Sequence, residues 1–252
     1  MGTSYEQRLE TLKIQNSAKY FTSKYFSYCP YNGSQYEHNN IQNLFLSKLE
    51  SNERNLNVIA SRQRGTTSTL CEYAFWDAFM TQRSGRVNVI ITPTLTQGRS
   101  LSEIIYNDME LGRDELLENT NIDIMKHVHM NKSGFQDDNR NSIIFGSVAT
   151  LTSTLRGKHV STLYMDNTWM HSGKTYTHEI DFINFIKACG TRIVMLQTAL
   201  VGDKPSYVEE QSNVILLPDT LNANYSLERE ETYINRIGAT RFAQEYLLER
   251  TS

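Results

Sequence analysis

The sequence predicts an α/β fold in which a mostly parallel sheet is covered by helices on both faces. From residue 41 onward, short apolar runs typical of buried strands alternate with longer segments in which apolar residues recur every three or four positions. Parallel strands need crossover connections, usually helices, and strands buried on both faces read as continuous apolar runs. The composition, with 39% hydrophobic and 21% charged residues, is that of an ordinary folded domain.

The first 40 residues differ from the rest because they are polar and hold six of the 14 tyrosines. A short helix is predicted near residues 5–25, followed by a loop through Pro30 and Gly33. Tyrosine combines a large apolar body with a polar tip. Residues 1–40 are therefore interpreted as an N-terminal extension, either packed on the domain or lying over a partner, and residues 41–252 as one domain.

Beyond this extension, the spacing of apolar residues assigns the elements in order. In the segment from 67 to 82, Leu70, Ala74 and Phe75 share one side of a helix, and the same spacing predicts helices over 41–49, 67–82, 96–111, 179–189 and 227–249. Short runs rich in Val, Ile and Leu predict strands over 56–61, 87–92, 122–130, 141–146, 161–166, 192–198 and 213–218. Pro93 ends the second strand because proline cannot continue a hydrogen-bonded ladder.

Charge and cysteine content narrow the functional classes. A formal net charge of −3 and a pI near 6.1 argue against a protein that binds DNA through a general basic surplus. The three cysteines, Cys29, Cys71 and Cys189, form no CxxC pair and are typical of free thiols in a reducing compartment. No run approaches the roughly 18 apolar residues of a membrane span, and the N-terminus has no hydrophobic signal segment. We expect an intracellular protein with no membrane segment.

A polar turn, SRQRGTTS at residues 61–68, directly follows strand 56–61 and opens helix 67–82. The order strand, glycine turn, helix presents backbone N–H groups and a helix N-terminus to phosphate groups. Strand 161–166 ends in Asp166, which is suited to hold Mg²⁺ together with a hydroxyl of the turn. These two features predict a phosphate-binding loop and an acidic strand end.

The turn resembles the phosphate-binding loop of the ATPase domain of tailed-phage terminase large subunits. That loop reads SRQ-x-GKT and is followed by another hydroxyl residue. The agreement covers Ser61, Arg62, Gln63, Gly65 and Thr67. The sequence departs from the pattern one position before Thr67, where a threonine replaces the family's lysine.

Further segments resemble the same family in the same order. Gln42 matches a glutamine that contacts adenine, and an Arg-Gly pair at 156–157 precedes the acidic strand. Asn167 replaces the glutamate that follows the acidic strand, and the coupling strand, residues 192–200, lacks its usual proline. Residues 238–249 resemble the segment that closes the ATPase domain. The resemblance spans roughly residues 35–250 and implies a P-loop fold of the RecA/ASCE-like class without a nuclease domain.

The resemblance also implies a set of site residues. Nucleotide would be bound by Gln42, Ser61, Arg62, Gln63, Arg64, Gly65, Thr66, Thr67, Ser68 and Asp166. Mg²⁺ would be held by Thr67 and Asp166. Thr66 lacks the charge of the missing lysine, and Asn167 cannot accept a proton near neutral pH as the missing glutamate would. We therefore expect ATP and Mg²⁺ binding to be weak or absent, with little hydrolysis, as in a pseudo-ATPase.

Two alternatives remain open. In the first, Arg62 or Arg64 engages the phosphate, with Lys174 as a further source of charge, and the chain is an active DNA-packaging motor ATPase. In the second, the chain is a DNA- or protein-binding module that reuses the fold. For every reading the resemblance implies viral packaging or DNA-handling partners, a homo-oligomer, weak DNA binding by the monomer, and the host cytoplasm.

Two other groups of polar residues are interpreted as surface features. His127 and His129 lie two apart on a predicted strand and would share one face, without a third metal ligand at the expected spacing. An acidic cluster is interpreted as the solvated face of a helix; its members are Asp108, Glu110, Asp114, Glu115 and Glu118.

Overall fold

The computed structural model describes residues 4–28, 33–51, 53–150, 154–155, 157–167, 190–198, 214–223 and 225–248. The predicted helix at 179–189 lies outside these ranges, as do Cys29, Cys189 and Lys174. None of the helices in the described ranges combines the length and the apolar character that crossing a bilayer requires.

The described residues form an eight-stranded sheet with the order β3-β4-β5-β2-β6-β7-β1-β8. Its strands are β1 Asn55–Ala60, β2 Val87–Thr92, β3 Val128–Asn131, β4 Gly134–Asp137, β5 Ser142–Ser147, β6 Thr162–Asp166, β7 Arg192–Thr198 and β8 Val214–Leu217. All neighbours from β5 to β8 pair in parallel, whereas β3–β4 and β4–β5 are antiparallel. The predicted mostly parallel sheet is confirmed.

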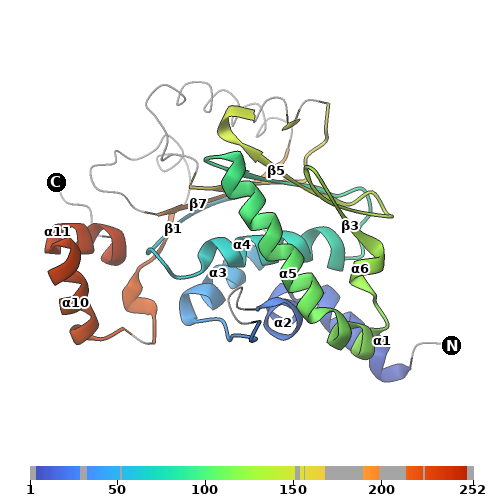
Figure 1. Ribbon diagram of the computed structural model, residues 1–252, viewed down its shortest axis with the longest axis horizontal. Coiled ribbons are helices and arrows are strands. Elements are labelled where there is room, and N and C mark those ends of the chain that lie inside the picture. Colours follow the sequence, from blue (N-terminus) through green and yellow to red (C-terminus); the bar gives the residue numbers. More distant parts are fainter. Residues whose placement is uncertain are drawn as a thin grey trace.

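The helices of the described ranges are α1 Tyr5–Asn16, α2 Ala18–Phe21, α3 Asn40–Glu50, α4 Thr66–Phe75, α5 Leu95–Thr120, α6 Ile124–His127, α10 Leu227–Ile237 and α11 Ala239–Phe242. Single π-helical turns continue three of them, over Thr22–Phe26, Trp76–Met80 and Ala243–Leu247, and 3₁₀ turns lie at Val148–Thr150 and Asp219–Leu221. Figure 1 shows α3, α4 and α5 on one face of the sheet, with α10 and α11 beyond the β1 end.

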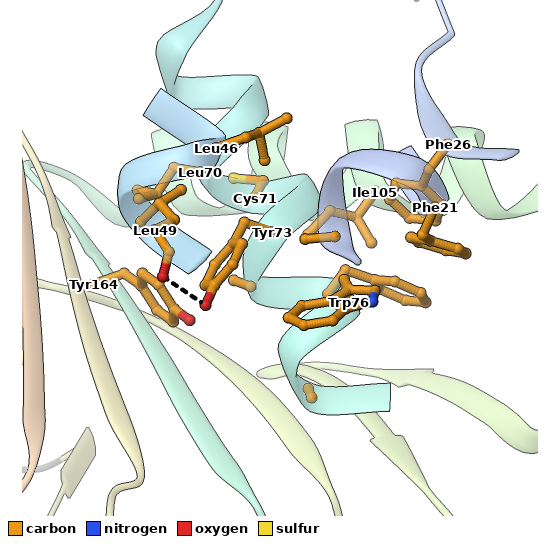
Figure 2. Close-up of a cluster of buried hydrophobic side chains, with 14 of the residues drawn as sticks. Phe21, Phe26, Leu46, Leu49, Leu70, Cys71, Tyr73, Trp76, Ile105 and Tyr164 are labelled. Atoms are coloured by element: carbon orange, nitrogen blue, oxygen red, sulfur yellow. Dashed lines mark hydrogen bonds between the residues drawn. The ribbon is translucent and has the colours of Figure 1, made fainter. Parts of the chain in front are cut away.

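The main core lies between the sheet and these helices. Each buried strand alternates its side chains between the two faces, so Tyr164 of β6 points into this core (Figure 2). The described part of the N-terminal extension belongs to the same core, since Phe21 and Phe26 are buried there. The ring of Phe26 stacks on Phe75 of α4 with 4.5 Å between centroids. Residues 14–26 are thus packed on the domain.

A second apolar cluster lies on the opposite face of the sheet. It contains the alternate strand residues, among them Ile91 of β2 and Met165 of β6, together with Leu155 and Val160. The sheet is therefore buried on both faces, which explains why its strands read as unbroken apolar runs.

The interpretation of residues 122–130 as one strand is wrong. Asn121 ends α5 in the left-handed conformation with φ of 63°, and the chain then forms the short helix α6 before β3 begins at Val128. β4, which pairs with β3 as a hairpin, was not predicted, because its four residues carry no run of apolar side chains. His127 therefore lies on α6 and His129 on β3, and both are exposed and face Asp138.

Helix α5 continues to Thr120, well past its predicted end. One of its residues, Asp108, departs from the predicted solvated acidic face. The helix passes so close to the N-terminal segment that a Cβ on Gly112 would lie 1.9 Å from the carbonyl oxygen of Tyr25. Four members of the acidic cluster are exposed, as predicted, but Asp108 is buried beneath the extension. Its carboxylate accepts the N–H of Tyr28 at 3.2 Å. Burial, with the nearby Glu72 carboxylate, raises the pKa of Asp108 to about 9.

Replacing Asp108 by asparagine is expected to stabilise the protein at neutral and alkaline pH. The pKa of Asp108 is about 9 in the folded chain and about 3.9 in an unfolded one, so stability is fully present below the lower value and is lost as the pH rises towards the higher one. The asparagine side chain would keep the oxygen that accepts the Tyr28 N–H and would not ionise.

The free energy of unfolding of Asp108→Asn and of the parent, measured by urea denaturation, should therefore diverge with rising pH. The gap should widen by more than about 1.4 kcal/mol, the equivalent of one pKa unit, between about pH 5 and about pH 8. Parallel pH profiles for the two proteins would contradict this assignment.

Candidate phosphate-binding site

The turn between β1 and α4 folds around a small hollow. β1 ends at Ala60, and Gly65 is the N-cap of α4. Gln63 and Gly65 both adopt the left-handed region, with φ of 57° and 72°. The hollow measures about 330 Å³ and is lined by residues 61–67. Because the first N–H groups of a helix have no partner within it and carry its partial positive charge, this hollow is suited to an anion.

Gly65 lies at the closest approach between the loop and α3. A Cβ at this position would be 2.7 Å from Nε2 of Gln42, and the positive φ also disfavours other residues. Gln42 Nε2 donates to the hydroxyl of Thr69 at 3.2 Å, and that hydroxyl donates to the carbonyl of Gly65 at 3.1 Å. Gln42 is 4% exposed and supports the loop from the α3 side.

The acidic strand end lies beside the loop. Within the sheet, β7 separates β1 from β6, and the loop after β1 reaches across it to the end of β6. The hydroxyl of Thr67 donates to Oδ1 of Asp166 at 3.1 Å, and the side-chain amide of Asn167 donates to the same oxygen at 3.0 Å. Burial raises the pKa of Asp166 to about 6, although both donated hydrogen bonds favour its ionised form.

The oxygens of Thr67 and Asp166 are spaced like two neighbouring ligands of a magnesium ion. Mg²⁺ takes oxygen ligands at roughly 2.0–2.1 Å in octahedral geometry, which puts neighbouring ligands about 2.9 Å apart. The separation of 3.1 Å between the Thr67 hydroxyl and Oδ1 of Asp166 is close to that value. Both residues predicted to hold the metal are thus adjacent.

Both arginines of the loop are paired with carboxylates from the C-terminal part of the chain. Arg64 is buried, and its Nη2 donates to Oδ2 of Asp219, which is also buried. Arg62 is 32% exposed and lies 3.3 Å from Oε2 of Glu245, whose other oxygen accepts from Arg241 at 2.8 Å. Residues 61–67 therefore offer the hollow no cation that is free of a carboxylate partner.

Three buried polar atoms at this site have no hydrogen-bond partner among the described residues. They are Oγ of Ser61, Nε of Arg64 and Oδ1 of Asp219. Ser61 is one of the lining residues and is 2% exposed, and its backbone N–H donates to the carbonyl of Leu217 on β8. A buried hydroxyl without a partner is unfavourable.

The fold brings the predicted site residues close together, but only some of them line the hollow. Residues 61–67 line the hollow, with Thr66 as the first residue of α4, and Ser68 lies half-buried in its first turn. Asp166 meets the loop through Thr67, whereas Gln42 faces the loop backbone. Sequence reasoning missed Asp219 and Glu245. Asp219 follows the edge strand β8 by two residues, the same strand-then-acid pattern that identified Asp166.

Solved structures of phage large terminases have a fold similar to that of this chain. The large terminase ATPase domain of Thermus phage P74-26 matches with a TM-score of 0.58 and 16% identity, over 94% of this chain and 99% of that chain. The HK97 bacteriophage large terminase matches with a TM-score of 0.59 and 12% identity, over 87% of this chain and 47% of that one. For a large terminase from the thermophilic bacteriophage D6E the values are 0.55, 12%, 84% and 53%.

The chain has a P-loop, RecA/ASCE-like fold with a mostly parallel sheet. Within that class, the chain has the fold of the ATPase domain of phage large terminases. It spans nearly all of the isolated P74-26 domain and about half of the two longer terminases. No protein-family profile matches the sequence, and no curated protein matches it by sequence.

Because the Arg64–Asp219 pair is buried and Arg62 is partly exposed, replacing Arg64 should destabilise the protein much more than replacing Arg62. Arg64→Met should lower the free energy of unfolding by roughly 3–5 kcal/mol, because it leaves the Asp219 carboxylate buried without a partner. Arg62→Met should cost about 1 kcal/mol or less, since Arg62 is partly exposed. Combining Arg64→Met with Asp219→Leu should restore most of the loss. Urea denaturation measures all three, and equal losses at the two arginines would disprove the assignment.

Proposed function

We propose that this chain is a terminase-like P-loop domain of a phage DNA-packaging or DNA-handling assembly, in which it binds nucleotide weakly and hydrolyses ATP slowly or not at all. The terminase ATPase fold and the loop at residues 61–68 support the first part. Because the chain would hydrolyse ATP slowly or not at all, its role in the assembly would be structural or regulatory.

The observation that carries this proposal is that both cations among residues 61–67 are paired with carboxylates. Thr66 occupies the position of the expected lysine and has no charge. Arg64 cannot move to a phosphate without leaving the buried Asp219 carboxylate unpaired, which is costly. Phosphoryl transfer depends on positive groups that stabilise the charge of the transition state. A hollow whose two lining arginines are both engaged by carboxylates is therefore a poor catalyst.

Asn167 supports the same conclusion at the other end of the site. A general base contributes about 10²–10⁴-fold to a rate, and a carboxamide cannot accept the proton of the attacking water near neutral pH. The side-chain amide of Asn167 instead donates to Asp166.

What remains is a cradle for phosphate and Mg²⁺. The large terminase from bacteriophage D6E has been solved with ATP-γ-S and with ADP. In this chain the loop N–H groups would bind phosphate oxygens, and Thr67 with Asp166 would hold Mg²⁺, which neutralises phosphate charge when bound. These residues bind and orient, and none of them activates water.

The second candidate is an active packaging motor that uses Arg62. Its guanidinium is the more exposed of the two in the loop, and its pairing with Glu245 is less buried than that of Arg64 with Asp219. This alternative predicts that Arg62→Ala abolishes ATP hydrolysis that the parent protein performs.

The proposed setting follows from the terminase-like fold. The partners are viral packaging or DNA-handling proteins in the host cytoplasm, and several copies of the chain act together. With a net charge of −3, DNA contact by one copy is weak and would show as a gel shift only at low salt.

Phosphate release by the purified chain tests the proposal. With ATP, Mg²⁺ and DNA present, turnover should stay far below the roughly 1–10³ s⁻¹ of ordinary enzymes. Thr66→Lys combined with Asn167→Glu should raise turnover by more than about 10²-fold, because the two changes restore a cation and a base. Thr66→Met combined with Asn167→Gln is the matched uncharged control. Turnover of about 1 s⁻¹ in the parent would refute the pseudo-ATPase, and parent activity lost in Arg62→Ala would favour the active ATPase that uses Arg62.

A further inference from the structure

We propose that Gln42 positions the phosphate loop and does not read a base, so that the site takes polyphosphate anions without discriminating among nucleobases. This inference rests on the proposed binding of phosphate at residues 61–68, and it is independent of whether ATP is hydrolysed.

The side chain of Gln42 is occupied at both ends of its carboxamide. Its Oε1 accepts the backbone N–H of Asn39 at 3.0 Å, while its own backbone N–H donates to the Asn39 side chain at 3.0 Å. Its Nε2 donates to the Thr69 hydroxyl. A glutamine that reads adenine must present one donor and one acceptor together to the edge of the base. The buried carboxamide of Gln42 has no such free edge.

The same contacts fix the backbone of the loop. Asn39 Nδ2 donates to the carbonyl of Arg64 at 3.2 Å, and Thr69 donates to the carbonyl of Gly65. In a trans peptide the carbonyl and the following N–H point in opposite directions. Holding these two carbonyls on the side of α3 and α4 therefore turns the N–H groups of Gly65 and Thr66 the other way. Gln42 acts on a ligand through the loop.

The hollow itself is built for phosphate. Ser61, one of the lining residues, has a buried hydroxyl without a partner among the described residues. The lining residues 61–67 include no aromatic or aliphatic side chain on which a base could stack. Recognition by this wall is recognition of oxygen atoms and negative charge.

Isothermal titration of the full chain with ATP, GTP and inorganic triphosphate, each with Mg²⁺, tests the inference. The three dissociation constants should agree within about threefold. A preference for ATP over GTP of more than about tenfold would overturn it, as would no binding of any of the three up to about 5 mM. Because phosphate release is measured separately, rapid turnover would refute the pseudo-ATPase and leave this inference intact.

Substitutions distinguish a positioning role from base reading. Gln42→Ala should weaken all three ligands equally, by roughly threefold to thirtyfold, because the loop loses its support. Thr69→Val should do the same, and Thr69→Ser, which keeps the hydroxyl, should bind like the parent. Ser47→Ala, at an exposed site of α3, is the matched control and should change nothing. A loss in Gln42→Ala confined to ATP, with inorganic triphosphate unaffected, would overturn the proposal, and thermal melting confirms that each variant is folded.

Discussion

The constraint on which the site depends is the reversal of the chain between β1 and α4. Five residues join the last strand residue, Ala60, to the first helical residue, Thr66. This short path requires left-handed backbone at Gln63 and Gly65, and it leaves no room for a side chain where the loop meets α3. Once the turn is made, the N-terminus of α4 faces the hollow and Thr67 meets the carboxylate at the end of β6.

The charges of the loop are engaged within the protein. The loop has the form of a phosphate cradle, yet its two arginines are paired with acids that follow the edge strand β8 and the last helix. Arg64 and Asp219 are both buried, so their pairing compensates for a desolvation cost that either charge alone would incur. Among the described residues, both arginines that line the hollow are therefore engaged by carboxylates.

Much of the fold could be predicted because the strands of a sheet buried on both faces appear in the sequence as continuous apolar runs. Strand β2 was predicted to the residue, and the loop and acidic strand end were found by their order. The failures at Asp108 and Arg64 share a cause, which is a partner distant in sequence. Asp108 is buried against Tyr28 and Glu72, and Arg64 meets an acid 155 positions away. Local sequence patterns do not reveal such long-range pairs. The short hairpin of β3 and β4 was missed for another reason, because it has too few apolar residues to form a recognisable strand pattern.

The insertion of β7 between β1 and β6 has a consequence for how the molecule folds. Asn55 of β1 is paired with Ile193, and the hydroxyl–carboxylate contact joins residues 99 positions apart. Such pairings close long loops before they gain any compensating contact, which slows folding. The ligand cradle is complete only when β6 and β7, far along the chain, have paired beside β1.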